Sequence, residues 1–198
     1  GTRGNAEVVT EERTVPSFTG VSSNNAIDVE LVVNPKLPGE DVPLQVEAES
    51  NLIGQVTTEV DSDLLEVDVL ESVNPTRPMR VSGAIRAFGR AAANNAARVT
   101  VSGLETNAIV LSANNAGQIS LTGTSAAVEL EVDNGGRIEA EDLEVDNASV
   151  DLDNGGSAIL CVTGAVTGSV SNGASLTVRC RGDISGVETR NGGSVADR

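Results

Sequence analysis

Residues 133–140 read DNGGRIEA, and the first four letters are one of six versions of a recurring phrase. The other versions are NNAA at 94–97, NNAG at 114–117, DNGG at 153–156, SNGA at 171–174 and RNGG at 190–193. The second position always holds an asparagine, and these are Asn95, Asn115, Asn134, Asn154, Asn172 and Asn191. Successive asparagines are separated by 20, 19, 20, 18 and 19 residues. Because asparagine and glycine tolerate positive φ, the phrase predicts one tight turn in each unit of about 19 residues.

Aliphatic residues occupy the even offsets on both sides of each asparagine, while the odd offsets hold Thr, Ser, Glu and Asp. Four residues after the asparagines come Val99, Ile119, Ile138, Ala158, Leu176 and Val195. Since successive side chains of a strand point to opposite faces, the even positions face inward and the odd ones outward. One such unit cannot bury its apolar face alone, but stacked units can. The pattern therefore predicts an all-β fold, a right-handed parallel β-helix of coils of about 19 residues.

Stacking would place equivalent asparagines about 4.8 Å apart in one column. Their side-chain amides can then form hydrogen bonds along the column, as amide ladders do between stacked strands. We interpret the six asparagines as a structural turn ladder rather than as ligand-binding residues.

The first 79 residues contain alternating strand segments in place of the repeat. The clearest are 28–33, 44–48, 56–60 and 65–69, and Asn74-Pro75-Thr76-Arg77-Pro78 is the best internal boundary. The alanine-rich stretch 84–97 is interrupted by Gly89 and Asn94-Asn95, so we expect strand and turn there rather than helix. We predict one domain over 1–198, with the strands of 1–79 continuing or capping the stack formed by coils 80–198.

Composition restricts the possible partners and cofactors. The chain carries 29 acidic and 13 basic side chains, a net charge of −16, and no histidine. Such a surface repels nucleic acid, which requires clustered Lys and Arg. No run of 18 apolar residues is present, so we expect no insertion of this segment into a membrane. Two cysteines without histidine do not make a zinc site, and we predict no cofactor.

The acidic stretch Glu139 to Asp146, followed by Asp151 and Asp153, raises the question of calcium. It lacks both the EF-hand spacing and the nonapeptide of calcium-binding β-rolls. We interpret it as a solvated acidic face and predict no metal ligands. No activated nucleophile is evident, and scattered carboxylates carry almost no information about hydrolysis, so we predict no catalytic residues.

Several short motifs resemble the head GIN domain family of auto-transporter adhesins. They are Gly4-Asn5, Glu12-Arg13 with Val15 and Phe18, Val29-Glu30-Leu31, then Glu49, Asn51 and Leu52, and Thr58-Glu59-Val60. The resemblance implies an exported bacterial surface protein with a β-helical fold and no established catalytic residues. The chain departs from the family pattern in its Asn-Gly-Gly turns and in lacking the aromatic residue common near the last coils.

Cys161 and Cys180 are the only cysteines and lie 19 residues apart, which is one coil. Stacked positions suit the Cα separation of a disulfide, and the export implied by the family would permit oxidation. However, Cys161 lies seven residues after Asn154, whereas Cys180 lies eight after Asn172. Strict alternation would put them on opposite faces, so the predicted disulfide requires a bulge, and two free thiols remain the alternative.

The first functional hypothesis is a non-catalytic exported module, an adhesin-like surface scaffold that binds a protein or glycan of the cell surface. The alternatives are a secreted polysaccharide-active enzyme and a homo-oligomeric structural envelope protein. Export would place the protein in the periplasm, on the outer surface or outside the cell, although no signal segment stands in this sequence.

Overall fold

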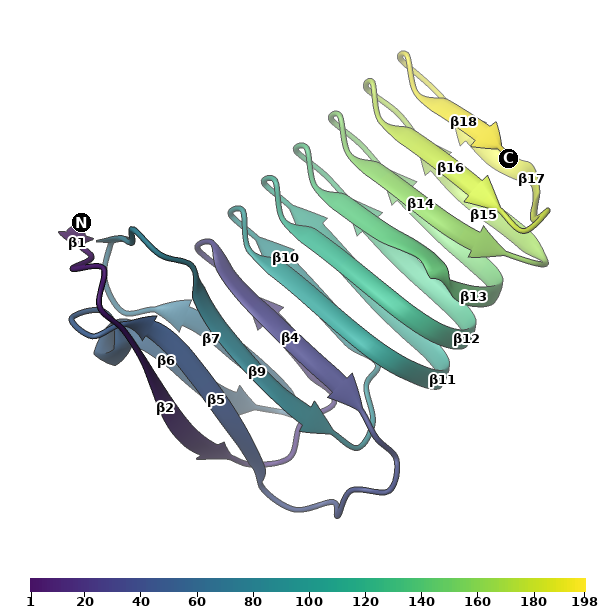
Figure 1. The fold of residues 1–198 in the computed structure, drawn as a ribbon. Coiled ribbons are helices and arrows are strands. Elements are labelled where there is room, and N and C mark those ends of the chain that lie inside the picture. The colour runs from purple at the N-terminus through teal and green to yellow at the C-terminus, as the bar shows by residue number, and fades with distance from the viewer.

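The computed structural model describes residues 1–198 as a stack of parallel β coils, a β-solenoid (Figure 1). Three long strands each run from one asparagine turn, around a bend, to the next: β11 (Arg98–Asn114), β12 (Gln118–Val132) and β13 (Arg137–Leu152). The later coils are divided into β14 (Ser157–Val162), β15 (Ala165–Val170), β16 (Ser175–Arg179), β17 (Asp183–Thr189) and β18 (Ser194–Asp197).

The ladder register confirms the alignment on asparagines. Val99 pairs with Ile119, Ile119 with Ile138, and Ile138 with Ala158. The same row continues to Leu176 and Val195. These are the positions four residues after each asparagine, so the aliphatic period of the sequence is also the register of the stack.

Each coil contributes to two layers. The arms that lead into the asparagine turns form the pre-turn layer, and the arms that follow the turns form the post-turn layer. The inward side chains of both layers pack into one core cluster of 46 buried residues, which extends from Val15 to Val178. At the end opposite the turns, the long strands bend with register shifts, and Gly103 and Gly123 there have positive φ.

The N-terminal strands both continue the stack and cap it. β3 (Gly20–Ser23) is parallel to β10 (Arg90–Asn94) and β7 (Leu64–Val69), and β4 (Ile27–Val33) is parallel to β11 and β9 (Met79–Ile85). Beyond them, β5 (Val42–Glu49) pairs antiparallel with β9 and with β2 (Val8–Val15), while β6 (Val56–Asp61) pairs antiparallel with β7.

The remaining elements are short. β1 (Thr2–Arg3) pairs with β8 (Val73–Asn74), and the 3-10 helix η1 (Ile53–Gln55) precedes β6. No helix forms over 84–97, where β9 ends and β10 follows. No helix of the structure is both long enough and apolar enough to cross a bilayer.

Candidate functional site

The asparagines form a column of turns. Each asparagine has a φ between 46° and 52°. The residue after it is also left-handed, for example Ala96 (63°) and Gly135 (73°). The residue after each asparagine except the last donates its amide to the asparagine carbonyl of the next coil, for example Ala96 to Asn115 at 3.0 Å. Asn25, with φ 55°, begins the same column, because Ala26 donates to the Asn95 carbonyl at 3.0 Å. The six expected turns are therefore joined by a seventh.

The side-chain amides interact less uniformly than the backbone does. Asn115 donates to Asn95 at 3.4 Å and Asn191 to Asn172 at 3.1 Å. In the middle of the column the amides of Asn154 and Asn172 donate instead to Asp133 and Asp153, at 2.7 and 2.6 Å. The backbone amide of Asn154, then the hydroxyl of Ser171, lower the pKa of Asp153 by hydrogen bonding. These side chains form hydrogen bonds with one another along the column and thereby link neighbouring coils.

The cysteines are brought together by a turn rather than by a bulge. The ladder places Cys161 opposite Arg179, and Cys180 follows in a turn where its φ is 68° and that of Arg181 is 64°. Two consecutive left-handed residues redirect the chain, so the one-position offset is absorbed. The Cα atoms are 5.1 Å apart and the sulfurs are bonded at 2.00 Å.

The acidic stretch faces solvent. Glu139, Glu141, Asp142, Glu144 and Asp146 are all exposed. Two of them form surface ion pairs, Glu139 with Arg137 at 2.8 Å and Glu141 with Arg179 at 3.2 Å. Across the chain no three His, Cys, Asp or Glu side chains are grouped as metal ligands.

Three residues of the motifs that carried the family resemblance, Asn5, Glu49 and Asn51, lie close together at the capped end of the stack. Glu49, at the end of β5, is fully buried and accepts hydrogen bonds from the amides of Ala6 and Thr76 and from the Thr76 hydroxyl. The Thr76 hydroxyl is the main reason that the pKa of Glu49 is lowered. Beside it the Asn5 amide donates to Asn51 Oδ1 at 3.1 Å, and Asn51 Nδ2 donates to the Arg3 carbonyl at 2.9 Å. Sequence reasoning did not assign this cluster a role.

A polar row crosses the outer surface of the post-turn layer. The ladder aligns Arg80 with Asp28, Asp28 with Arg98, Arg98 with Gln118, and Gln118 with Arg137. Burial raises the pKa of Asp28, and the positive charges of Arg98 and Arg80 oppose that shift. The row therefore concentrates three arginines on an otherwise acidic protein.

A polar depression of about 230 Å³ adjoins the row at Arg80. Nearly every lining side chain can form hydrogen bonds: Thr10, Glu30, Gln45, Glu47, Arg80 and Ser82. Arg80 lies 3.7 Å from Glu47, and both side chains remain about half exposed. Gln45 donates to Glu12 at 3.1 Å, which fixes its orientation. The depression offers donors and acceptors at fixed positions on a rigid sheet.

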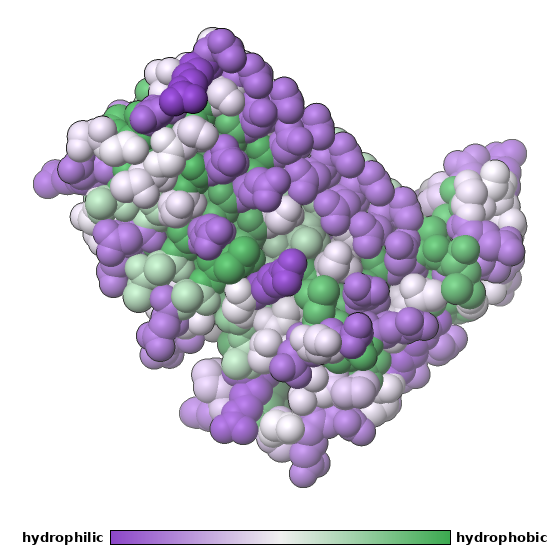
Figure 2. Space-filling model, turned by 180° about the vertical axis from the view of Figure 1, so that it is seen from behind, coloured by the Kyte–Doolittle hydropathy of each residue, from purple (hydrophilic) through white to green (hydrophobic).

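The pre-turn layer carries a different depression, of about 430 Å³, lined mainly by small aliphatic side chains such as Ala108, Ala127 and Ala165. Val110 at its side is 43% exposed. Figure 2 shows this side of the molecule, where hydrophobic areas are interrupted by hydrophilic ones.

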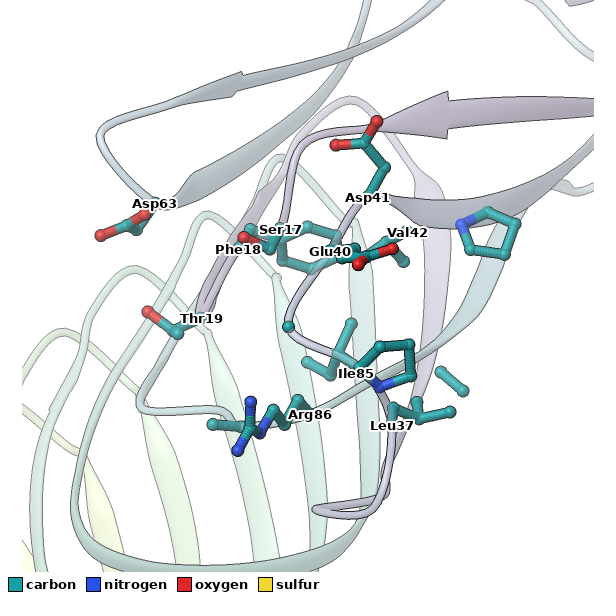
Figure 3. A pocket seen from close by; sticks show the side chains of 15 residues that line it. Ser17, Phe18, Thr19, Leu37, Glu40, Asp41, Val42, Asp63, Ile85 and Arg86 are labelled. Carbon is teal, nitrogen blue, oxygen red and sulfur yellow. The ribbon is translucent and has the colours of Figure 1, made fainter.

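A third cavity, the Phe18 groove, lies at the bend end of the N-terminal coils (Figure 3). In the regular coils a continuous bent strand closes this end. Here it is bounded by the connections 16–19 and 86–89, the loop 34–41 and the turn at Asp63, which surround a cavity of about 440 Å³. Phe18, Val42 and Ile85 form a buried apolar floor.

Comparisons with known proteins agree with this architecture. Residues 17–182 match the model of the family described as "Putative auto-transporter adhesin, head GIN domain". No curated protein matches the chain.

Three crystal structures of bacterial proteins share the fold. A "putative adhesin" from Bacteroides fragilis is 13% identical with a TM-score of 0.71, covering 100% of this chain and 99% of that one. A "putative adhesin" from Parabacteroides merdae is 12% identical with a TM-score of 0.54, covering 100% and 98%. A "putative lipid binding protein" from Parabacteroides distasonis is 15% identical with a TM-score of 0.51, covering 99% and 98%.

Proposed function

Because this chain belongs to the head GIN domain family, we propose that residues 1–198 form one exported, non-catalytic module that binds a cell-surface partner. The family and two of the three similar structures are described as adhesins, the third structure is described as a lipid binding protein, and none of them is described as an enzyme. An adhesin-like role requires a surface that keeps its shape while it is exposed outside the cell. Export itself remains part of the proposal, as does the partner.

The observation that carries the proposal is the polar depression beside Arg80 on the rigid post-turn layer. Stacked strands hold outward side chains at a repeat of about 4.8 Å, so the row from Arg80 to Arg137 is a fixed array. Its guanidinium, carboxylate and amide groups match the hydroxyl groups of a glycan, which both donate and accept hydrogen bonds. We therefore favour a glycan over a protein as the partner.

The test is a panel of acidic and neutral glycans, assayed for binding and for cleavage with the same protein samples. We expect binding without cleavage. Arg80→Ala should weaken the binding severalfold, while Arg90→Ala, an exposed arginine on β10 in the pre-turn layer, should leave it unchanged. Cleavage of any glycan would favour the polysaccharide-active enzyme instead.

Light scattering at several concentrations addresses the homo-oligomeric alternative. We expect the mass of a monomer throughout the range. A mass that rises with concentration would support a structural assembly, and binding that disappears in Arg90→Ala as in Arg80→Ala would contradict the assignment to the post-turn layer.

A further inference from the structure

The Phe18 groove exists because the N-terminal coils lack the closing bend of the later ones. β4 ends at Val33, and the chain leaves the stack through the loop 34–41 before it returns as β5. Pro38 in this loop and Pro43 at the start of β5 line the groove, and their fixed φ restricts the chain where it borders the cavity. At about 440 Å³ the cavity lies within the range of roughly 300–1,000 Å³ that is typical of small-ligand sites. The groove is therefore a formed concavity of useful size.

The floor of the groove is apolar. Phe18 is 3% exposed and Ile85 is 1% exposed, so the two side chains join the core beneath while one surface of each borders the cavity. Leu37 and the two prolines extend the apolar wall toward solvent. Such a floor favours an aliphatic chain, and each methylene that it buries strengthens binding by about fourfold.

The rim of the groove is charged and unbalanced. Three carboxylates stand on it, those of Glu40, Asp41 and Asp63, against the single guanidinium of Arg86. Figure 3 shows Asp63 on one side of the Phe18 ring, Glu40 and Asp41 on the other side, and Arg86 below the ring in this view. None of the four side chains forms a hydrogen bond or an ion pair within the protein. Their partners would therefore have to come from elsewhere.

Arg86 does not cancel this negative charge. Its Nη1 lies against the backbone of Gly39, within 3.0 Å of the position a Cβ would take there. The guanidinium therefore lies over the loop 34–41, and its single positive charge leaves the three carboxylates with an excess of two negative charges. The whole protein carries a net charge of −16, which adds to the attraction for a cation.

We propose that the Phe18 groove binds a small cationic amphiphile, an aliphatic chain that carries a protonated amine. The chain lies on Phe18, Ile85 and Val42, and the ammonium group lies at the rim beside Glu40 and Asp41, with Asp63 adding negative charge across the groove. An ammonium group donates three hydrogen bonds and accepts none, so an acidic rim is its complement. This site shares no residue with the polar depression, so it does not depend on the proposed glycan binding.

The test compares octylammonium, octanoate and octyl glucoside, each titrated below its micellar concentration by calorimetry. We expect octylammonium to bind at least tenfold more tightly than octanoate, with octyl glucoside between them. Hexylammonium should bind more weakly than octylammonium, by about fourfold for each methylene lost from the floor. Tighter binding of octanoate would overturn the charge argument and assign the site to anionic amphiphiles through Arg86.

Two variants locate the binding. The double variant Asp41→Asn with Asp63→Asn should weaken octylammonium several-fold and leave octyl glucoside unchanged, because only the charge is altered. Ala84→Trp fills the groove from an exposed position and should abolish binding of all three compounds. Ala126→Trp, an exposed alanine on β12 outside the groove, is the matched control and should bind as the wild type does. Unchanged binding in a folded Ala84→Trp protein would place the ligand elsewhere and refute the proposal.

Discussion

Thr76 holds the buried carboxylate of Glu49 with two groups at once. Its hydroxyl donates to Oε1 at 2.6 Å, and its backbone amide donates to Oε2 at 2.8 Å. The Ala6 amide adds a third bond to Oε1, at 2.5 Å. Glu49 thereby connects the end of β5 to Ala6, which lies between β1 and β2, and to Thr76, which lies between β8 and β9, so the carboxylate links two segments outside the strand ladders.

The first prediction concerns these hydrogen bonds to the Glu49 carboxylate. Glu49→Gln replaces one acceptor oxygen with an NH₂ group, which then faces backbone donors and leaves them without a partner. Since unsatisfied buried donors are costly, we expect a clearly lower Tm in thermal unfolding followed by circular dichroism. Glu47→Gln, on the same strand with a side chain 42% exposed, is the control and should change Tm little. Equal Tm values for the two variants would contradict the role assigned to Glu49.

The second prediction concerns acid. Hydrogen bonds lower the pKa of Glu49 and of Asp153 below their ordinary values of 4.5 and 3.8. A carboxyl with a lowered folded pKa contributes stability above its unfolded pKa, and this contribution is lost as the pH falls through the folded pKa. The Tm of the wild type should therefore fall as the pH drops below about 4, and the difference from Glu49→Gln should narrow. A Tm difference between the wild type and Glu49→Gln that stays constant down to pH 2 would show that the charge of the Glu49 carboxylate does not contribute to stability.

The periodicity of the sequence was sufficient to predict the coils, because each inward aliphatic must repeat where the next coil lies. It did not reveal Asn25, although Asn24-Asn25-Ala26 matches Asn94-Asn95-Ala96 letter for letter. The excursion through β5 to β9 separates Asn25 from Asn95 along the chain, so the regular spacing that identified the other turns is lost. The Phe18 groove was missed for the same reason, since non-repeating connections form it. Glu49 was quoted only as part of a family motif, because a buried acid at the end of a strand has the same alternation as an exposed one.

The third prediction concerns the cysteines. Cys161 and Cys180 are 19 residues apart, and closing a loop of this length contributes about 3 kcal/mol. Treatment with reductant, or the double variant Cys161→Ser with Cys180→Ser, should lower the free energy of unfolding by about that amount. Mass spectrometry after thiol alkylation checks the bond directly in protein produced by an export route. Two alkylated thiols in the untreated sample would show that the disulfide does not form.

The fourth prediction separates two glycines. Gly123, at the bend of β12, has φ +131°, and a Cβ there would overlap the carbonyl of Leu104. Gly135, in an asparagine turn, has φ +73° with open space around it. Gly123→Ala should cost about 3 kcal/mol or more, because steric overlap adds to backbone strain. Gly135→Ala should cost only about 1 kcal/mol, from the backbone alone. Chemical denaturation measures both, and similar costs would mean that the bend relaxes around the added methyl group.

The fifth prediction is a stabilising substitution that the repeat itself suggests. Ala96 and Ala116 occupy left-handed positions, with φ of 63° and 62°, where the corresponding residues of later coils are Gly135, Gly155, Gly173 and Gly192. An alanine in this conformation costs roughly 1–2 kcal/mol, whereas glycine adds roughly 0.5–1 kcal/mol of unfolded-state entropy. Ala116→Gly should therefore raise the free energy of unfolding by about 0.5–1 kcal/mol. Ala126→Gly, in the middle of β12, removes a methyl group without relieving a left-handed residue, so it should lower that free energy instead. A loss of stability in both variants would show that the turn is held by its amide-to-carbonyl column strongly enough to make alanine as favourable as glycine.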